Sequence, residues 1–268
     1  MLHSMQKDNM DINNLTIEGQ IRHDILVAAN RAGKVGAHIA PSLSIVEICI
    51  AVLQLFEEGK DTFVLSKAHG ALGYYAAMHR VGMITTEQFD SFEENGGEFP
   101  GQPSRSVNNH IDYSSGSLGM GLSYAAGKAW ASKNAKVYVI LGDGELDEGS
   151  NWEAASVIAK NGINNVVAIV DCNGLQSDGR CEDIQNKDFE KIWEGHGWKV
   201  IKCPGHDTEA IKKLIAEADG SKPVVLLADT VKGKGVSFME NNNEWHHHEL
   251  KDNQLEEALK EVTDKYGL

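Results

Sequence analysis

Apolar and polar residues follow two different periods along this chain. Residues 16–33 carry apolar side chains at helical spacing and end on Gly33, whereas residues 43–56, LSIVEICIAVLQLF, are almost entirely apolar. The first pattern predicts an amphipathic helix and the second predicts a buried one. Residues 62–66, TFVLS, are a short apolar run that predicts a strand.

From about residue 118 the pattern becomes regular. Helical patterns cover 118–133, 150–162, 188–197 and 207–220, and continuous runs rich in Val, Ile and Leu cover 136–142, 165–173, 198–203 and 222–231. Unbroken apolar strands that alternate with helices are typical of a parallel sheet buried on both faces. We therefore expect an α/β fold, a single three-layer domain with a mainly parallel sheet covered by helices on both faces.

Nothing in the composition marks a boundary inside the chain. There is no internal repeat, low-complexity tract or linker, and 268 residues with 41% hydrophobic content suffice for one large core. Residues 15–268 are expected to form one domain, preceded by a flexible tail over residues 1–14.

Charge and apolar content argue against several classes of function. The net charge is −14 and Lys and Arg form only short pairs, which disfavours binding to nucleic acid or to a membrane surface. The first residues lack a signal-peptide pattern and no stretch is apolar enough to span a membrane, so that a cytoplasmic location is expected. The cysteines show no C-x-x-C spacing, and we expect them to be reduced and mostly buried: Cys49, Cys172, Cys181 and Cys203.

Four acidic residues crowd into six positions directly after the predicted strand over 136–142. They are Asp143, Glu145, Asp147 and Glu148. Asn173 follows the next predicted strand, and ligands of parallel sheets bind beyond the carboxyl ends of the strands. Carboxylate and amide oxygens suit Mg²⁺, whose remaining ligands are commonly phosphate and water. A tight Asp-Gly turn without a ligand is the alternative that this stretch alone leaves open.

The spacing between the Asp143 segment and Asn173 is a second feature of this stretch. Gly142-Asp143-Gly144, 28 intervening residues and then Asn173 resemble the motif of enzymes that use thiamine diphosphate. The resemblance implies that Asp143, Asn173 and the backbone carbonyl of Leu175 bind Mg²⁺, with Ca²⁺ or Mn²⁺ as substitutes. It also implies that Gly142 and Gly144 lie at the diphosphate of the cofactor.

Further stretches are similar to transketolases, in the order that this family requires, from about Ile17 to about His248. GAHIAPSLSIVEI places one active-site histidine of the family on His38, and FVLSKAHGALGYY places a second, which also contacts the cofactor, on His69. SSGSLGMGLSYAAGKA places Gly116 and Leu118 against the cofactor. A lone histidine is more often structural, but the motif positions favour a catalytic role for these two.

EWHHHEL is similar to the segment that carries a third active-site histidine. His246 is the best candidate for it, and His247 is the alternative in a neighbouring register. Glu148 matches a glutamate that lies at the subunit interface of the family, in a hydrogen-bond network between two cofactors. We expect Glu145 and Asp147 to face solvent or neighbouring donors.

Two departures from the family bear on function. The family's Gly-His-Pro reads Gly101-Gln102-Pro103 here, and glutamine does not titrate near neutral pH, which leaves the donor substrate open. Transketolases also continue into a pyrimidine-binding domain that supplies the glutamate needed to activate the cofactor. The resemblance therefore implies a C-terminal partner subunit with that domain, in a heterotetramer of two plus two chains.

Together these features predict the N-terminal subunit of a split transketolase, which transfers a two-carbon ketol unit between sugar or sugar-phosphate substrates. His38, His69 and His246 are its expected catalytic residues. One alternative is another thiamine-diphosphate enzyme subunit, of the 2-oxo acid dehydrogenase or decarboxylase type, which SKAHG and Asn-Gly-Leu disfavour. The other is a regulatory protein that binds Mg-diphosphate without catalysis, and a pure binder would not need His38 and His69.

Overall fold

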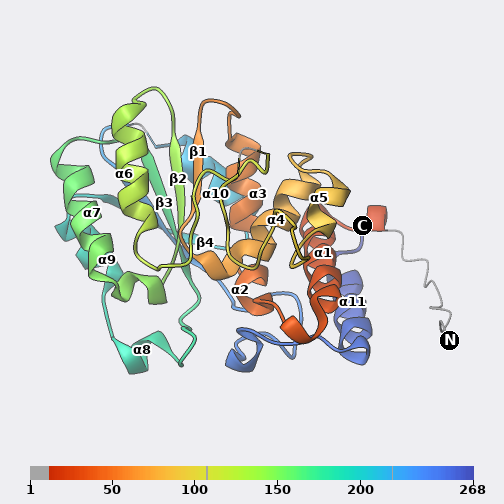
Figure 1. Ribbon diagram of the computed structural model, residues 1–268. Helices are drawn as coiled ribbons and strands as arrows, with labels where there is room; N and C mark the ends of the chain where they lie inside the picture. The colour runs from red at the N-terminus through yellow and green to blue at the C-terminus, as the bar shows by residue number, and fades with distance from the viewer. Residues whose placement is uncertain (1–11, 107, 219) are drawn as a thin grey trace.

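A five-stranded sheet forms the centre of the computed structural model, which describes residues 12–106, 108–218 and 220–268 (Figure 1). The strands lie in the order β1-β2-β3-β5-β4, and all four neighbouring pairs are parallel. Their bounds are β1 (Thr62–Leu65), β2 (Val137–Gly142), β3 (Val166–Cys172), β4 (Lys199–Pro204) and β5 (Val224–Asp229). The predicted parallel sheet is confirmed, and no strand extends more than one residue beyond the apolar run that predicts it.

Helices connect the strands and cover the sheet. The α-helices are α1 (Ile17–Ala32), α2 (Ile39–Leu43), α3 (Val46–Leu55), α4 (Ala71–Arg80), α5 (Thr86–Asp90), α6 (Gly121–Ala131), α7 (Gly149–Lys160), α8 (Cys181–Ile184), α9 (Phe189–Gly195), α10 (Thr208–Ala216) and α11 (Asp252–Tyr266). The short 3-10 helices are η1 (Ile12–Asn14), η2 (Gly33–Val35), η3 (Ala68–Gly70), η4 (Gly144–Asp147) and η5 (Asn243–Trp245).

Alternate residues of the central strands face opposite layers of helices. Val137, Val139 and Leu141 of β2 belong to a buried cluster with side chains of α6, α7 and α9. Tyr138 and Ile140 belong to a second cluster, with side chains of α1, α3, α4, α10 and α11. Figure 1 shows α6, α7 and α9 on one side of the sheet and α1, α3 and α4 on the other. Both faces are covered, which confirms the three-layer α/β fold and explains why the strands are apolar throughout.

The apolar run over 43–56 is helical for most of its length, but α3 begins only at Val46. The residues from Val46 to Leu53 are all buried, as the run predicts. The break before α3 lies at Ser44, whose hydroxyl is 2.7 Å from Asp171 Oδ2 in β3. This contact lies at the break between α2 and α3 and joins residues 127 positions apart, so that local periodicity cannot reveal it.

The structure describes only part of the predicted tail, and it describes all four cysteines. Residues 1–11 of the tail lie outside the described residues and residues 12–14 form η1, so that a domain boundary at residue 15 stays a prediction. All four cysteines are free; Cys49 and Cys203 are buried, and Cys172 and Cys181 are half-buried. Among the described residues, no helix combines the length and the apolar content needed to cross a membrane.

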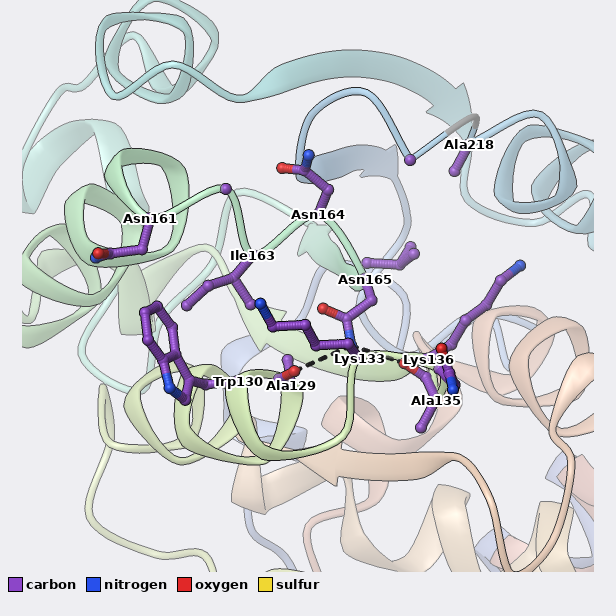
Figure 2. A pocket seen from close by; sticks show the side chains of 14 residues that line it. Ala129, Trp130, Lys133, Ala135, Lys136, Asn161, Ile163, Asn164, Asn165 and Ala218 are labelled. Carbon is purple, nitrogen blue, oxygen red and sulfur yellow. Dashed lines mark hydrogen bonds between the residues drawn. The ribbon is translucent and has the colours of Figure 1, made fainter.

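The two ends of the sheet differ in what they carry. At the amino end, a hollow of about 490 Å³ lies beside Trp130 and Asn164 (Figure 2). Asn165, which precedes β3, donates from Nδ2 to Ala129 O at 3.2 Å and to Ala135 O at 2.8 Å. These contacts join the end of α6 to the start of β3 and give this asparagine a structural role. The loops that follow β1, β2, β3 and β5 meet at the carboxyl end.

Candidate functional site

A cavity of about 100 Å³ lies at the carboxyl end of the sheet, where sequence reasoning places the ligand site. Gly142, Asp143 and Gly144 line it from the end of β2, and Asn173 and Leu175 line it from the loop after β3. The two strands are in register, with Gly142 opposite Asp171, so that the loops leave the sheet side by side. The structure thus brings together the five residues of the predicted metal and diphosphate motif.

The Asp143 carboxylate is held in place by backbone N–H groups. Oδ1 accepts a hydrogen bond from Gly144 N at 2.8 Å, and Oδ2 accepts one from Gly174 N at 2.6 Å. The residue is only 5% exposed. Burial and the neighbouring Asp171 carboxylate raise the pKa of Asp143 to about 6. Negative charge in this position is incompletely compensated by the protein, and a bound cation would relieve it.

Asn173 is oriented by its own loop. Its Nδ2 donates to Asp171 Oδ2 at 2.9 Å, and its Oδ1 accepts from Leu175 N at 3.0 Å. The amide oxygen therefore lies on the same loop as the Leu175 carbonyl, and both residues line the cavity together with Asp143. A carboxylate, an amide and a carbonyl form the hard oxygen set that Mg²⁺ prefers, so the residues present fit this metal.

The remaining acids of the crowded stretch have partners of their own. Glu145 is 3% exposed and accepts hydrogen bonds from Ser66 Oγ and from Gly119 N, and burial raises its pKa. Asp147 is half-buried and accepts from Lys187 Nζ at 2.7 Å. Both face neighbouring donors, and Glu145 does not face solvent. Glu148 is exposed at the start of α7.

Two lysines that sequence reasoning missed also line the cavity. Lys67 follows β1 and forms an ion pair with Asp171, and its Nζ also donates to Ser44 Oγ at 3.0 Å. Lys232 follows β5 and is 1% exposed. Burial, with Lys67 as the second cause, lowers the pKa of Lys232 to about 8. Two ammonium groups beside one cavity favour an anionic ligand. Both lysines follow strand ends, so the rule that singles out Asp143 would also have singled them out.

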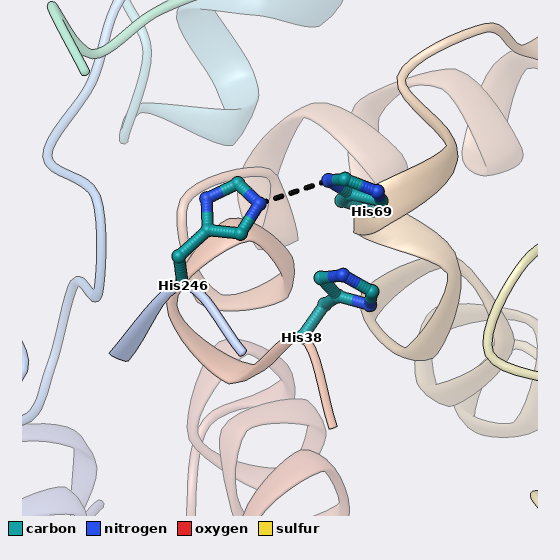
Figure 3. A group of neighbouring side chains, drawn as sticks. All are labelled: His38, His69 and His246. Atoms are coloured by element: carbon teal, nitrogen blue, oxygen red, sulfur yellow. Dashed lines mark hydrogen bonds between the residues drawn. The ribbon is translucent and has the colours of Figure 1, made fainter. Parts of the chain in front are cut away.

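Three histidines from distant parts of the chain meet beside this cavity (Figure 3). The rings of His38 and His69 are stacked, with centroids 3.9 Å apart and planes inclined by 10°. His69 Nδ1 lies 2.9 Å from His246 Nε2. Burial is the main cause that lowers the pKa of His38 to about 2, of His69 to about 4 and of His246 to about 3. All three rings are therefore neutral at pH 7.

His246 and His247 occupy different places around this cluster. His246 lines the cavity with His69, whereas the ring of His247 lies 4.6 Å from that of His38. His38 and His247 line a neighbouring hollow of about 470 Å³. The geometry thus favours His246 as the third histidine beside the motif, and its catalytic role stays a prediction.

The neighbouring hollow also contains the glutamine that replaces the family's histidine. Gln102 lines it, together with Ser104, Ser114 and Ser115. Gly116 has a φ of +149°, and a Cβ there would lie 2.6 Å from Gln102 Oε1. The positive φ favours glycine at this position, and the absence of a side chain lets the end of Gln102 approach the loop.

The other predicted cofactor contacts divide into two groups. Leu118 lines the cavity and is 37% exposed, a high value for leucine. Gly116 and Glu148 are not among the residues that line it. Glu148 instead packs against Gly119, where a Cβ would lie 2.6 Å from the Glu148 Cβ. Direct cofactor contacts by Gly116 and Glu148 stay predictions.

Comparison with protein families gives a match over most of the chain. The family model described as the transketolase thiamine diphosphate binding domain matches residues 54–268. This match includes α11, which the resemblance based on motifs does not reach, and it begins after the segment that carries His38.

Several relatives resemble the chain over nearly its whole length. One of them, a subunit of the apulose-4-phosphate transketolase of Actinobacillus succinogenes, is 35% identical, over 90% of this chain and 92% of the relative. The 6-deoxy-6-sulfo-D-fructose transketolase subunit SqwG of Clostridium sp. is 34% identical, over 86% of this chain and 90% of the relative. Human transketolase is 35% identical over 75% of this chain but only 33% of its own length.

Solved structures show the same fold. The transketolase of Campylobacter jejuni superposes with a TM-score of 0.81 and 24% identity, over 95% of this chain and 43% of that protein. A transketolase variant of Pichia stipitis superposes with a TM-score of 0.82 and 25% identity, over 96% of this chain and 41% of that protein. The chain thus spans less than half the length of these solved proteins and nearly the full length of the relatives named as subunits.

Proposed function

Because the chain belongs to the transketolase family, we propose that it is the N-terminal, thiamine-diphosphate-binding subunit of a split transketolase. In this proposal it transfers a two-carbon ketol unit between sugar or sugar-phosphate substrates once it is joined to a partner subunit. The observation that carries the proposal is the cavity at the carboxyl end of the sheet. It combines the predicted oxygen ligands, two lysines and two of the three clustered histidines.

The diphosphate end of the site follows from the charges around the cavity. Asp143, Asn173 and the Leu175 carbonyl would hold a divalent cation, with Mg²⁺ the metal that this oxygen set suits best. Lys67 and Lys232 would offset the negative charge of the diphosphate. A Cβ on Gly144 would lie 2.6 Å from the Gln176 side chain, so that glycine keeps the Asp143 loop close to the loop after β3.

The histidines beside the cavity are proposed to transfer protons to and from the sugar substrate. Thiamine diphosphate, when bound, supplies the carbon that carries the two-carbon unit from one sugar to the next. His38, His69 and His246 are neutral at pH 7, because their pKa values are lowered mainly by burial. Neutral imidazoles can accept or donate a proton at the hydroxyl groups of a sugar, as general acid–base catalysis requires.

The hollow beside His38 is the proposed entrance for the sugar substrate. Its lining is rich in hydroxyl and amide groups, among them Gln102, Ser104 and Ser115. The Ser115 hydroxyl is buried and has no hydrogen-bond partner among the described residues. Such groups suit a polyhydroxylated ligand. Because Gln102 cannot titrate near neutral pH, it would select the donor sugar by hydrogen bonding and not by proton transfer.

A partner subunit is part of the proposal. Three relatives are named as subunits of transketolases, and the chain covers 90% or more of the length of each. Two are named for apulose-4-phosphate, and the third is SqwG. Their names imply a second chain, for which we propose a C-terminal subunit with a pyrimidine-binding domain, in a heterotetramer of two plus two chains. The cytoplasmic location expected from the sequence belongs to this proposal as well.

Reconstitution tests the proposal. The purified chain, a candidate partner subunit and an equimolar mixture are assayed for ketol transfer between sugar phosphates, with thiamine diphosphate and Mg²⁺ present. We expect activity from the mixture alone. Release of CO₂ from 2-oxo acids by the mixture would instead favour the decarboxylase-type alternative, and cofactor binding without any transfer would favour the regulatory one.

A further inference from the structure

The ammonium group of Lys232 is surrounded by three hydrogen-bond acceptors. Nζ lies 3.0 Å from Gln176 O, 2.8 Å from Asn243 Oδ1 and 2.9 Å from His246 Nδ1. Asn243 Nδ2 donates to Ser177 O at 3.1 Å, which leaves Oδ1 as the amide atom that faces the lysine. An ammonium has three N–H donors and no acceptor, so His246 Nδ1 must accept the third hydrogen bond.

The hydrogen bond that His246 Nδ1 accepts also determines where the proton of His69 lies. A neutral imidazole carries one proton, and because Nδ1 of His246 accepts a hydrogen bond, its Nε2 carries the proton. His246 Nε2 lies 2.9 Å from His69 Nδ1, which must therefore accept. The proton of His69 is then on its Nε2. Burial is the main reason that the pKa is lowered to about 3 for His246 and to about 4 for His69. Both rings are therefore neutral at pH 7.

We propose that Lys232 is a positioning residue that fixes the tautomers of His246 and His69, so that each ring carries its proton on Nε2. The hydrogen bonds run in one direction, from the Lys232 ammonium through His246 to His69. His69 is thereby a hydrogen-bond donor at the nitrogen that does not contact His246. That His69 Nε2 donates to a substrate oxygen rests on the proposed ketol transfer. The assignment of the tautomers does not rest on it.

The same direction of hydrogen bonding argues against a metal ion within the histidine cluster. One nitrogen from each of His38, His69 and His246 lies within 4.8 Å of the others, which is close enough for a shared ion. A ligating nitrogen must be free of its proton, but His246 Nε2 carries one. The second nitrogen of a ligating histidine usually donates to a carboxylate or a carbonyl, and here it faces an ammonium.

Nitrogen NMR of the whole chain tests the proposal without a partner subunit. The ¹⁵N-labelled chain is measured at pH 6.5, where Lys232 is an ammonium and both rings are neutral, in two-bond proton–nitrogen spectra, which distinguish protonated from unprotonated ring nitrogens. The chain has 11 histidines, and the signals of His69 and His246 are assigned by their loss in His69→Gln and His246→Gln. We expect both rings to be protonated at Nε2. A proton on Nδ1 of either ring in the unaltered chain would overturn the proposal.

Variants of Lys232 test the cause of these tautomers. A carboxylate accepts where an ammonium donates, so Lys232→Glu should move the proton of His246 to Nδ1 and, through the shared hydrogen bond, that of His69 to Nδ1 as well. Lys232→Met removes the donor without replacing it, and should bring the averaged shifts of His246 Nδ1 and Nε2 closer together. Lys234→Met is the control. This lysine is half-exposed, and among the described residues its one ion pair is with Glu240, at 4.0 Å.

The outcomes are distinct from those that test ketol transfer. Tautomers in Lys232→Glu and Lys232→Met that match those of the unaltered chain would overturn the proposal, even if the reconstituted enzyme were active. Reversal in Lys232→Glu would support it, even if no partner subunit restored activity. Should Lys232→Glu fail to fold, the spectrum of the unaltered chain and the shift in Lys232→Met still decide the question.

Discussion

Lys67 and Asp171 form an ion pair inside the protein, directly beside the loop that carries Asp143. The Asp171 carboxylate is fully buried, and it also accepts hydrogen bonds from Thr230 Oγ1 and from Asn173 Nδ2. Burial alone would raise the pKa of Asp171, but Lys67, together with the hydroxyls of Thr230 and Ser44, outweighs this effect and the pKa is lowered. The pair therefore joins the ends of β1 and β3 beneath the proposed cofactor site.

Removal of the lysine should leave a buried carboxylate without its cation. We expect Lys67→Met to lower the free energy of unfolding by about 3–5 kcal/mol, measured by urea denaturation at pH 7. Asp171→Asn in the same chain should restore part of this loss, because the uncompensated charge is then absent. Lys60→Met, at an exposed lysine, is the control. If the single variant at Lys67 were as stable as the control, the pair would have no structural role.

A second buried group links stability to pH. Burial would raise the pKa of Glu47, but Arg22 and His206 outweigh it and lower the pKa from 4.5 to about 2. A carboxyl with a lowered pKa in the folded state stabilises the protein above pH 4.5 and loses this effect as the pH falls toward 2. The shift corresponds to about 3 kcal/mol.

Glu47→Gln tests this linkage. We expect the variant to be less stable at pH 7, and we expect its difference from the unaltered chain to shrink by about 1 kcal/mol between pH 7 and pH 4. Urea denaturation at both pH values measures it, with the exposed Glu209→Gln as control. A difference that stays constant or grows at pH 4 would show that Glu47 is not the titrating group.

His38 and His69 should affect turnover more than cofactor binding. In the reconstituted enzyme we expect His38→Ala and His69→Ala each to lower kcat by roughly 100-fold, the effect of a positioned acid–base group. Calorimetry should find thiamine diphosphate affinity within about fivefold of the unaltered chain, since the diphosphate contacts remain. His110→Ala, at an exposed histidine, is the control. A loss of less than about threefold would assign the altered histidine a structural role.

Glu148 should matter for assembly. It is exposed at the start of α7, close to Gly119 and the exposed Leu118, as a residue at a subunit interface would be. We expect Glu148→Ala to weaken association with the partner subunit, or to change how cofactor binding at one site affects the other. Analytical ultracentrifugation of the mixture and cofactor titrations measure these effects, with Glu209→Ala as control. Unchanged assembly together with unchanged titrations would remove Glu148 from the interface.

The sheet could be predicted because its signal is local. Each strand is an unbroken apolar run that neighbouring helical patterns delimit, and burial on both faces needs no knowledge of the rest of the chain. The start of α3 could not be predicted in the same way. The apolar run continues across the break at Ser44, and the contact made there is with Asp171, 127 positions away.

The sequence predicts those residues of the candidate site that follow strands at a known spacing. Asp143 and Asn173 follow predicted strands at the spacing of a known motif. Lys67 and Lys232 also follow strands, but they were missed because that motif does not include them. The burial of Glu145 depends on donors from Ser66 and Gly119, which come from other segments. The hydrogen bond between His69 and His246 joins residues 177 positions apart, and only the folded chain reveals it.

The central claim is that this end of the sheet binds thiamine diphosphate through a divalent cation on Asp143, and calorimetry on the chain alone tests it most directly. Thiamine diphosphate is titrated into the unaltered chain, Asp143→Ala and the exposed control Asp183→Asn, with Mg²⁺ and again with a chelator. We predict binding to the unaltered chain and to Asp183→Asn only when Mg²⁺ is present, and no measurable binding to Asp143→Ala, because the cation joins the carboxylate to the diphosphate. Equal affinity in Asp143→Ala, or binding that survives removal of the metal, would contradict the claim.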